Sequence, residues 1–446
     1  MIFRKFLKAP PRKGSSEDRG KVLRWPGAPE PSSEATQASQ RLRHLLRRVA
    51  SGFATGATDL DPALVLTATV AGVAYGYSLL WAVVLCVPFL LSVFAVSARI
   101  GQETGSGLVD LLRSHYGKPA ARGCAGLVIV INMAMIVADL MAVTEGLAIL
   151  LDQRRILFVA ATAFSLWLIL IFHNYNKVTR VVVWLSLPLL AYVASAVLAR
   201  PSIKQVLLHT FVPHVARDPG YAMTMVALFG SLLTPYVIIW QTSSRREQAV
   251  TAMEPHSAAQ RAGTFLTTLI SYSVIVAAAS ALNPTSLPVG VQRASNISFR
   301  QAAMALSPIG EMGTTLFALG IIGAGLVALP VLVASVCYAT AEAMGWKSGL
   351  SETHWEAKRF YGLISAAVFV AGAANFLPIN PVRALYWSQV LAGILCVPIL
   401  ASILLLSNDR RVMRTTNTAS QNFWIGAAAG GLSAACLLLL WWKLFS

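Results

Sequence analysis

Long apolar stretches, separated by short polar segments, occupy nearly all of the chain after residue 50. Eleven of them approach or exceed the roughly 20 residues that an α-helix needs to cross the ~30 Å hydrocarbon core of a bilayer. The pattern therefore predicts an all-α polytopic membrane protein with about eleven transmembrane helices. The predicted spans are residues 51–76, 77–99, 123–151, 155–173, 178–199, 220–242, 262–283, 312–344, 359–377, 383–406 and 422–445.

The first 48 residues differ in kind, because they are rich in Pro, Ser, Arg and Lys. We interpret residues 1–48 as a basic, mostly disordered cytoplasmic tail with a short amphipathic piece at residues 40–48. This segment is too long and too polar before the first apolar run for a cleaved signal peptide, and its Arg content leaves an organellar transit peptide as the alternative. The first span is expected to be retained.

The composition agrees with a membrane protein, since 56% of the residues are hydrophobic and 12% are charged. The net charge of +17 is distributed unevenly. With the N-terminus in the cytoplasm, 27 of the 36 Lys and Arg residues fall in the tail and the cytoplasmic loops. The positive-inside rule therefore predicts a cytoplasmic (inner) membrane protein with a cytoplasmic N-terminus and an external C-terminus. A nucleic-acid partner is not expected, because the chain has no basic soluble domain with interleaved aromatic residues.

Motifs for other functions are missing from the sequence. No HExxH, Gly-x-Ser-x-Gly or Cys/His metal-ligand spacing occurs, which argues against a membrane enzyme or sensor. The sequence gives no evidence of an obligate protein partner or a bound cofactor. The cysteines lie inside apolar windows without CxxC spacing and are interpreted as small core residues: Cys86, Cys124, Cys337, Cys396 and Cys436.

Two apolar stretches are interrupted by polar residues and proline, at residues 58–62 (Thr-Asp-Leu-Asp-Pro) and at residues 233–236 (Leu-Thr-Pro-Tyr). A carboxylate in hydrocarbon is costly and persists where it faces a cavity or a cation. Proline frees a backbone carbonyl, which lipid cannot satisfy but a bound ion can. Paired interruptions of this kind indicate the substrate site of a transporter.

Simpler interpretations apply to each interruption taken alone. Most transmembrane prolines only bend a helix, so Thr234-Pro235 by itself is compatible with a kink. Asp59 and Asp61 are two residues apart and share one helical face only if the helix is unwound there. Unwinding at Asp61-Pro62 is what a binding site requires, whereas a structural ion pair is the alternative for either aspartate.

The interruptions also predict a repeat, because each opens a group of five spans. Five is odd, so the second group starts on the opposite side of the membrane and the two are related by an inverted pseudo-two-fold axis. The predicted units are residues 51–199, residues 220–406 and an additional peripheral helix at 422–445.

Two further acids lie in the third span. Asp139 and Glu145 are six residues apart, about 240° around a helix, and are expected to serve different surfaces. Asp139 could relay protons, gate the site or pair with an arginine. Glu145 lies near the outer end of the span, where it could be solvated.

Taken together, several short stretches make the chain resemble the Nramp family of divalent metal transporters, in its divergent Nramp-related branch, over nearly all of residues 51–410. The order and separation of these stretches carry the resemblance. They are residues 52–62 (GFATGATDLDP), 97–101 (SARIG), 104–105 (TG), 138–140 (ADL), 211–213 (FVP), 234–236 (TPY) and 388–390 (SQV).

The resemblance implies a leucine-transporter-like 5+5 inverted repeat with broken helices 1 and 6 and a divalent cation between them. Asp61 matches the aspartate of the family's Asp-Pro-Gly-Asn motif, which is a direct metal ligand. Leu64 occupies the position of the asparagine of that motif, which is also a ligand in the family. Thr234 and Tyr236 take the places of the methionine and the histidine of the Met-Pro-His motif. Gln241 occupies a position where the family usually has a second histidine.

In the third and tenth spans the match is mixed. Ala142 stands where the family often has a glutamate, while Asp139 and Gln389 are kept. Loss of the soft thioether removes a ligand that favours Mn²⁺ or Fe²⁺ over Mg²⁺, and a hard, wet site suits Mg²⁺. Loss of the histidines and the glutamate puts proton coupling in doubt.

We therefore predict import of Mg²⁺ or Mn²⁺ by alternating access, with Mg²⁺ favoured. The alternatives are an ordinary proton-coupled Mn²⁺/Fe²⁺ Nramp transporter and a transporter of amino acids or organic cations with the same fold. The predicted metal site comprises Asp61, Asp59, Thr58, Ser231, Thr234 and Gln389, where Thr58 and Ser231 contribute carbonyls freed by Pro62 and Pro235. The candidates for proton relay or gating are Asp139, Tyr236 and Gln241.

Overall fold

The fold is taken from a computed structural model of the chain, which describes residues 60–172, 187–248, 256–282, 295–349 and 356–445. These residues belong to one compact unit, Arg48–Ser446. The predicted tail at residues 1–48 lies outside the described residues.

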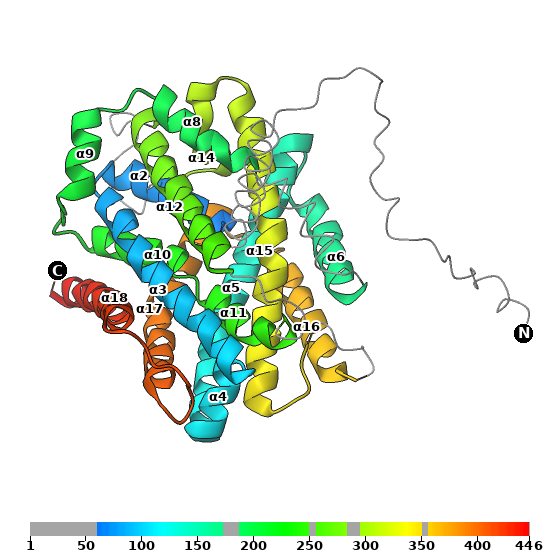
Figure 1. The fold of residues 1–446 in the computed structure, drawn as a ribbon. Helices are drawn as coiled ribbons and strands as arrows, with labels where there is room; N and C mark the ends of the chain where they lie inside the picture. The colour runs from blue at the N-terminus through cyan, green and yellow to red at the C-terminus, as the bar shows by residue number, and fades with distance from the viewer. Residues whose placement is uncertain (1–59, 173–186, 249–255, 283–294, 350–355, 446) are drawn as a thin grey trace, which may run out of the picture. The chain divides into compact units, whose positions relative to one another are not determined.

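Every regular element within those ranges is helical (Figure 1), which confirms the predicted all-α class. The helices are α2 (Pro62–Tyr75), α3 (Leu80–Thr104), α4 (Leu108–His115), α5 (Gly117–Leu151), α6 (Ile156–Phe172), η1 (Leu187–Leu190), α8 (Ala191–Leu198), α9 (Ile203–Phe211), α10 (Pro219–Leu232), α11 (Pro235–Gln248), α12 (His256–Ala281), α14 (Phe299–Ala303), η2 (Met304–Ile309), α15 (Met312–Met344), α16 (Lys358–Ala374), α17 (Pro381–Asn408) and α18 (Ala419–Phe445).

Seven helical segments among the described residues are long and apolar enough to cross a membrane. They coincide with seven of the eleven predicted spans: Leu80–Thr104, Gly117–Leu151, Pro219–Ser243, Gln260–Ala281, Met312–Met344, Pro381–Asn408 and Ala419–Trp441. The predicted spans at 155–173 and 359–377 are the 17-residue helices α6 and α16. Those at 51–76 and 178–199 are described only in their second parts, as α2 and as η1 with α8.

Proline has two different effects in these helices. Pro88, Pro330 and Pro398 lie inside α3, α15 and α17, and each helix continues past its proline. Pro62 and Pro235 instead occupy the first positions of α2 and α11, where the missing N–H is not needed. The two interruptions predicted from the sequence are thus helix boundaries rather than bends.

Helix α2 lies deep in the unit. It contacts α12, α10, α17 and α5 (Figure 1), and every residue from Pro62 to Val73 is buried. A helix that is apolar all round is stable only when neighbours surround it. The start of α2 is therefore held by protein on several sides.

Two glycines bring α10 and α17 into backbone contact. A Cβ atom placed on Gly230 would lie 2.3 Å from the carbonyl oxygen of Gln389, and one placed on Gly393 would lie 2.3 Å from the carbonyl oxygen of Val226. Small residues permit this close approach between transmembrane helices. The contact holds Gln389 within about one helical turn of the end of α10.

The segment between α17 and α18 is fastened to the end of α3. The Glu103 carboxylate accepts hydrogen bonds from the backbone N–H of Thr415, at 3.2 Å, and from its hydroxyl. The Arg99 guanidinium donates to the side-chain oxygens of Asn417 and Gln421, the latter at 3.3 Å. The peripheral helix α18 is thus anchored through its preceding loop and through Gln421 in its own first turn.

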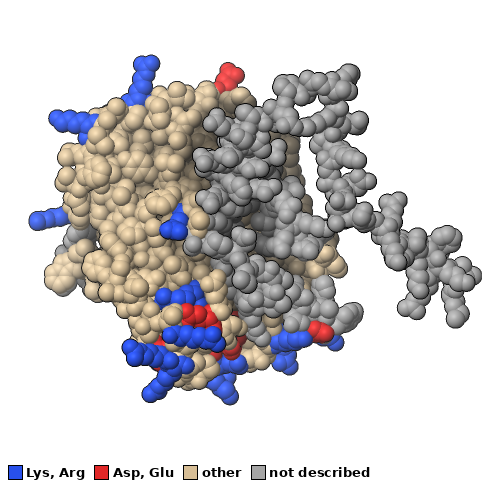
Figure 2. Space-filling model, in the orientation of Figure 1, with Lys and Arg blue, Asp and Glu red and all other residues tan. Residues whose placement is uncertain are grey.

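On the face drawn in Figure 2, charged side chains are concentrated at one end of the unit. In Figure 2, most visible Lys, Arg, Asp and Glu side chains gather at the end where Figure 1 places α4.

Candidate functional site

Asp61 begins the first described half-helix and is completely buried. Its Oδ1 accepts a hydrogen bond from the backbone N–H of Leu64 at 2.6 Å, so the aspartate is the N-cap of α2. Its other oxygen, Oδ2, lies 3.5 Å from the hydroxyl of Tyr236. One oxygen therefore stabilises the helix start, and the second faces the other broken helix.

The second interruption separates α10 from α11. The last bond of α10 runs from the N–H of Leu233 to the carbonyl of Phe229, at 2.8 Å. The chain re-enters a helix with the bond from the N–H of Val237 to the carbonyl of Thr234, at 3.1 Å. The break that was predicted at Thr234-Pro235 is confirmed.

Ser231 lies one turn before this break. Its hydroxyl donates to the carbonyl of Leu228 at 2.9 Å, so its side chain is occupied within α10. Its own carbonyl has no donor four residues on, because Pro235 lacks an N–H. A ligand role for Ser231 therefore rests on its backbone oxygen, as the sequence predicted.

Three predicted site residues carry buried polar atoms without a hydrogen-bond partner among the described residues. They are both carboxylate oxygens of Asp139, the hydroxyl of Thr234, and both side-chain amide atoms of Gln389. All three side chains are completely buried. An unsatisfied buried polar atom costs about 1–3 kcal/mol, so oxygen donors left in this way fit a site that coordinates a hydrated cation.

Asp139 joins the first interruption from α5. The carboxylate faces the backbone N–H of Ala63, and its charge interacts directly with that of Asp61. Among the described residues no arginine pairs with it, so the alternative of a structural Asp139–Arg pair gains no support from this part of the chain. Two carboxylates without a counter-charge favour a cation between or near them.

Tyr236 contributes from α11. The side chain is fully buried and its hydroxyl faces Asp61, which suits orientation of the carboxylate. This contact fits the predicted gating role or a positioning role for Tyr236.

The remaining predicted residues lie elsewhere or are not described. Gln241 accepts a hydrogen bond from Gln260 of α12, at 3.2 Å, and is not joined to the site by any of the contacts above. Glu145 pairs with Arg155 at 3.5 Å, so it is ion-paired rather than simply solvated. Thr58 and Asp59 lie outside the described residues.

Two positions where the sequence departs from the family are apolar and buried. Leu64 and Ala142 are both inside the core, and neither side chain offers a ligand atom. The atoms that could coordinate a cation at the interruptions are therefore oxygens, and Gln389 contributes its side-chain carbonyl oxygen. Within the described residues, no group of three or more His, Cys, Asp and Glu could hold a metal ion, which is consistent with a loosely ligated transported ion rather than a structural metal.

A further polar contact joins the end of α2 to the start of α10. The hydroxyl of Tyr75, at the end of α2, donates to Oδ2 of Asp218 at 2.6 Å. Asp218 also caps α10 by accepting from the N–H of Tyr221 at 3.1 Å, and the two tyrosine rings pack edge to face at 5.1 Å. Sequence reasoning missed this contact, although Asp218-Pro219 repeats the Asp-Pro helix start of α2.

Buried acids at broken helices in a polytopic bundle define a membrane transporter of the inverted-repeat class. The profile of the Nramp family, described as natural resistance-associated macrophage protein-like, matches residues 52–442. The chain belongs to the Nramp family. Because the members of this family are transporters, the prediction that the chain is not an enzyme is confirmed.

Curated relatives align over most of their length. The divalent metal cation transporter MntH of Pectobacterium carotovorum is 23% identical over 398 residues, covering 86% of this chain and 92% of the relative. MntH of Bacillus subtilis is 23% identical over 421 residues, covering 86% and 91%.

Solved structures show the fold. The Eremococcus coleocola manganese transporter, in complex with an aromatic bis-isothiourea compound, superposes with a TM-score of 0.68 at 15% identity, covering 93% of this chain and 88% of that one. MhsT in complex with L-phenylalanine gives a TM-score of 0.58 at 12% identity, with coverage of 88% and 98%. The predicted leucine-transporter-like fold is confirmed.

Proposed function

We propose that this chain imports divalent metal cations through the cytoplasmic membrane by alternating access, with Mg²⁺ or Mn²⁺ as the ion and Mg²⁺ favoured. The supporting observation is a set of buried polar atoms that have no hydrogen-bond partner among the described residues: the oxygens of Asp139, whose charge interacts with that of Asp61, and the oxygens of Thr234 and Gln389. The names of the relatives, divalent metal cation transporters, agree with this cargo class.

The proposed ion site uses Asp61 as its charged ligand. Oδ2 is available for the ion because Oδ1 already caps α2. Thr234 supplies a hydroxyl, Gln389 a side-chain carbonyl, and Ser231 a backbone carbonyl. Asp59 and the carbonyl of Thr58 complete the proposed set from the part of the first span outside the described residues.

The donor chemistry favours a hard ion. Hydroxyl, amide and carboxylate oxygens suit Mg²⁺ and Mn²⁺, whereas a thioether would favour softer metals. Mg²⁺ dehydrates reluctantly and keeps several waters. A site with one firmly placed carboxylate and several neutral oxygens leaves room for those waters.

Import by this site needs no proton. A divalent cation gains about 4.6 kcal/mol per 100 mV of inward-negative potential, twice the 2.3 kcal/mol of a single charge. With the N-terminus in the cytoplasm, as predicted from the distribution of Lys and Arg, the end of the unit at α4 would face the inside of the cell.

Proton-coupled Mn²⁺ or Fe²⁺ transport is the second candidate. Asp139 favours it, because a buried carboxylate with no cationic partner in the described part of the chain could carry a proton across the membrane. Amino-acid transport is disfavoured, since Asp61 and Asp139 would repel a substrate carboxylate.

Uptake by purified protein in proteoliposomes tests the proposal. A potassium gradient with valinomycin sets an inside-negative potential, and internal dyes report Mg²⁺ and pH while Mn²⁺ is added as a competitor. We expect electrogenic Mg²⁺ entry that Mn²⁺ inhibits, without acidification. Entry of Mn²⁺ alone, with acidification, would overturn the hard, uncoupled site and establish proton-coupled transport. Empty liposomes give the background.

A further inference from the structure

Glu342 is a buried acid that the proposed ion site does not use. It lies near the end of α15, and only 6% of its surface is exposed. A carboxylate placed there needs partners that compensate for its lost hydration. The groups that face it therefore indicate what the residue does.

The first partner is the N-terminus of the short helix α4. The N-cap of α4 is Gly107, which has no side chain to accept a bond from the first turn. Glu342 takes that place: its Oε2 accepts from the backbone N–H of Asp110 at 3.3 Å, and the N–H of Val109 lies near the same carboxylate. A Cβ atom on Gly107 would lie 2.0 Å from Oε1. A residue 235 positions further along the chain thus caps α4.

The second partner is α11, the half-helix that follows the break. The hydroxyl of Ser243 faces the Glu342 carboxylate. One residue earlier, the hydroxyl of Thr242 accepts from the N–H of Leu108, the first residue of α4, at 3.3 Å. The start of α4 is therefore held between α15 and α11.

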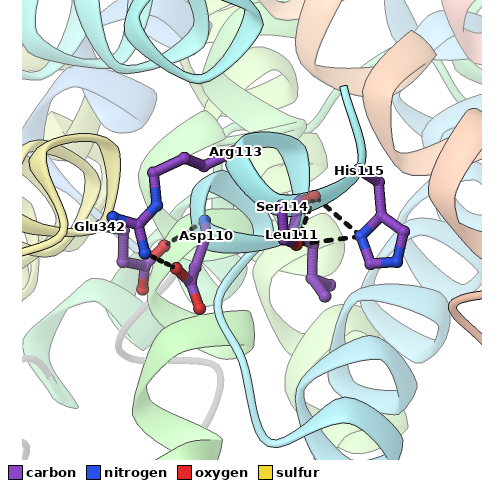
Figure 3. A network of polar contacts seen from close by, with 6 residues as sticks. All are labelled: Asp110, Leu111, Arg113, Ser114, His115 and Glu342. Atoms are coloured by element: carbon purple, nitrogen blue, oxygen red, sulfur yellow. Dashed lines mark hydrogen bonds and ion pairs between the residues drawn. The ribbon is translucent and has the colours of Figure 1, made fainter. Parts of the chain in front are cut away.

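The rest of α4 is satisfied locally (Figure 3). Arg113 pairs with Asp110 at 2.8 Å, and the ring of His115 and the hydroxyl of Ser114 bond to the carbonyl of Leu111. Arg113 is therefore not the counter-ion that fixes Glu342. The Glu342 carboxylate is the group that joins the start of α4 to the end of α15 in this view.

We propose that Glu342 is a latch residue, by which we mean a side chain that holds α11 and α15 together around the start of α4 and so keeps this end of the transport path closed. By capping α4 from α15 while facing Ser243, it keeps α11 closed against the bundle, so that opening the path from the break to this side requires release of the carboxylate. α11 carries Thr234 at its entrance and Tyr236 in its first turn, so its release changes the access of the proposed ion site. This role in transport rests on the proposed function.

A purely structural cap is the competing interpretation, and the chain allows the two to be separated. Glu342→Ala removes both the cap and the link to α15. Gly107→Asp combined with Glu342→Ala returns a capping side chain to α4 itself, since aspartate is a favoured N-cap, but leaves the link to α15 broken. The vacated carboxylate position gives the new side chain room.

Cys124 reports the opening. It is 7% exposed and close enough to Glu342 for their charges to interact. The other four cysteines are replaced by alanine, and the labelling rate of Cys124 with a soluble maleimide is measured in nanodiscs without divalent metal. Because removal of the Glu342 charge changes the reactivity of this thiol even without opening, the labelling rate is measured over a range of pH and expressed per thiolate. On that scale we expect Glu342→Ala and the double variant both to label roughly tenfold faster than the parent, the size of an ordinary coupling between sites. Glu356→Ala, which removes an exposed carboxylate paired with Lys347, should leave the rate unchanged.

Two results would overturn the latch. The first is a wild-type labelling rate in Glu342→Ala. The second is a double variant whose rate returns to that of the parent, which would leave capping as the whole role. Because no metal is added, the outcome is independent of the cargo: faster labelling in a protein that moves no divalent ion would support the latch and contradict the proposed function.

Discussion

The substitution Asp61→Asn separates the two roles of Asp61, which are to cap α2 and to bind the ion. Asparagine is as good an N-cap as aspartate, and its Oδ1 can accept from the N–H of Leu64 as Asp61 does at 2.6 Å. Its amide N–H₂ would face the Tyr236 hydroxyl, which can accept a hydrogen bond. The fold should therefore keep its stability within about 0.5 kcal/mol.

The ion site should respond differently. Removing one member of a buried charge pair costs about 3–5 kcal/mol. At 1.4 kcal/mol per tenfold change, the affinity for Mg²⁺ or Mn²⁺ should fall by roughly two to three and a half orders of magnitude. Asp61→Ala should lose about 1 kcal/mol of stability in addition, because it also removes the cap of α2.

Metal binding by isothermal titration, uptake in proteoliposomes and thermal unfolding would be measured on the same preparations. Asp218→Asn is the matched control, since Asp218 caps α10 by the same Asp-Pro arrangement and lies outside the proposed ion site. We expect its metal affinity to be unchanged. An Asp61→Asn protein that binds and transports the ion within threefold of the parent would refute the assignment of Asp61 as the charged ligand.

The other predictions concern the second interruption, the helix crossing and an outer segment. Thr234→Met restores a soft ligand and should raise the preference for Mn²⁺ over Mg²⁺ by roughly tenfold in competitive uptake. Gly393→Ala should destabilise the protein by about 1–3 kcal/mol in thermal unfolding, because the new Cβ lies 2.3 Å from the Val226 carbonyl oxygen. Burial, and then the nearby His214, lower the pKa of His209 below its ordinary value. The folded form therefore resists protonation, so the protection of the α9 amides, measured as the intrinsic exchange rate divided by the observed rate, should decrease as the pH falls below about 6.5.

Each of these has a matched comparison. Thr234→Ser keeps the hydroxyl and should keep the selectivity; an equal shift in both variants would contradict the thioether argument. Gly426→Ala on α18 adds a Cβ with nothing within 4 Å, and a loss of stability as large as that of Gly393→Ala would remove the steric explanation. His209→Gln should abolish the pH dependence in α9, and its persistence would assign it to another group.

Local chemistry explains why the helix boundaries could be predicted. Proline fixes its own φ and lacks an N–H, and Asp61 before Pro62 adds a capping side chain. These effects act over a few residues, so Asp61-Pro62 and Thr234-Pro235 could be located without knowing the fold. The same rule applied to Asp218-Pro219 moves the predicted start of the sixth span from residue 220 to Pro219, where α10 begins.

Contacts between distant segments could not be predicted in this way. The Tyr75–Asp218 bond joins residues 143 positions apart, and the cap of α4 comes from Glu342 on α15. A single acid in the apolar window 312–344 was itself a signal, because such residues are costly in a membrane helix. The contacts of Glu342 depend on how α15 packs against α4 and α11. This packing cannot be predicted from the residue pattern of α15 alone.

The attachment of the loop after α17 bears on how the protein can be engineered. Glu103 and Arg99 on α3 bond to Thr415, Asn417 and Gln421. A shortened chain that ends at Asn408 would retain every proposed ion ligand. It would leave the Glu103 carboxylate and the Arg99 guanidinium, at the end of α3, without these hydrogen-bond partners. Expression designs and fusion tags are therefore better placed beyond residue 446 than at the loop, even though α18 supplies nothing to the proposed ion site.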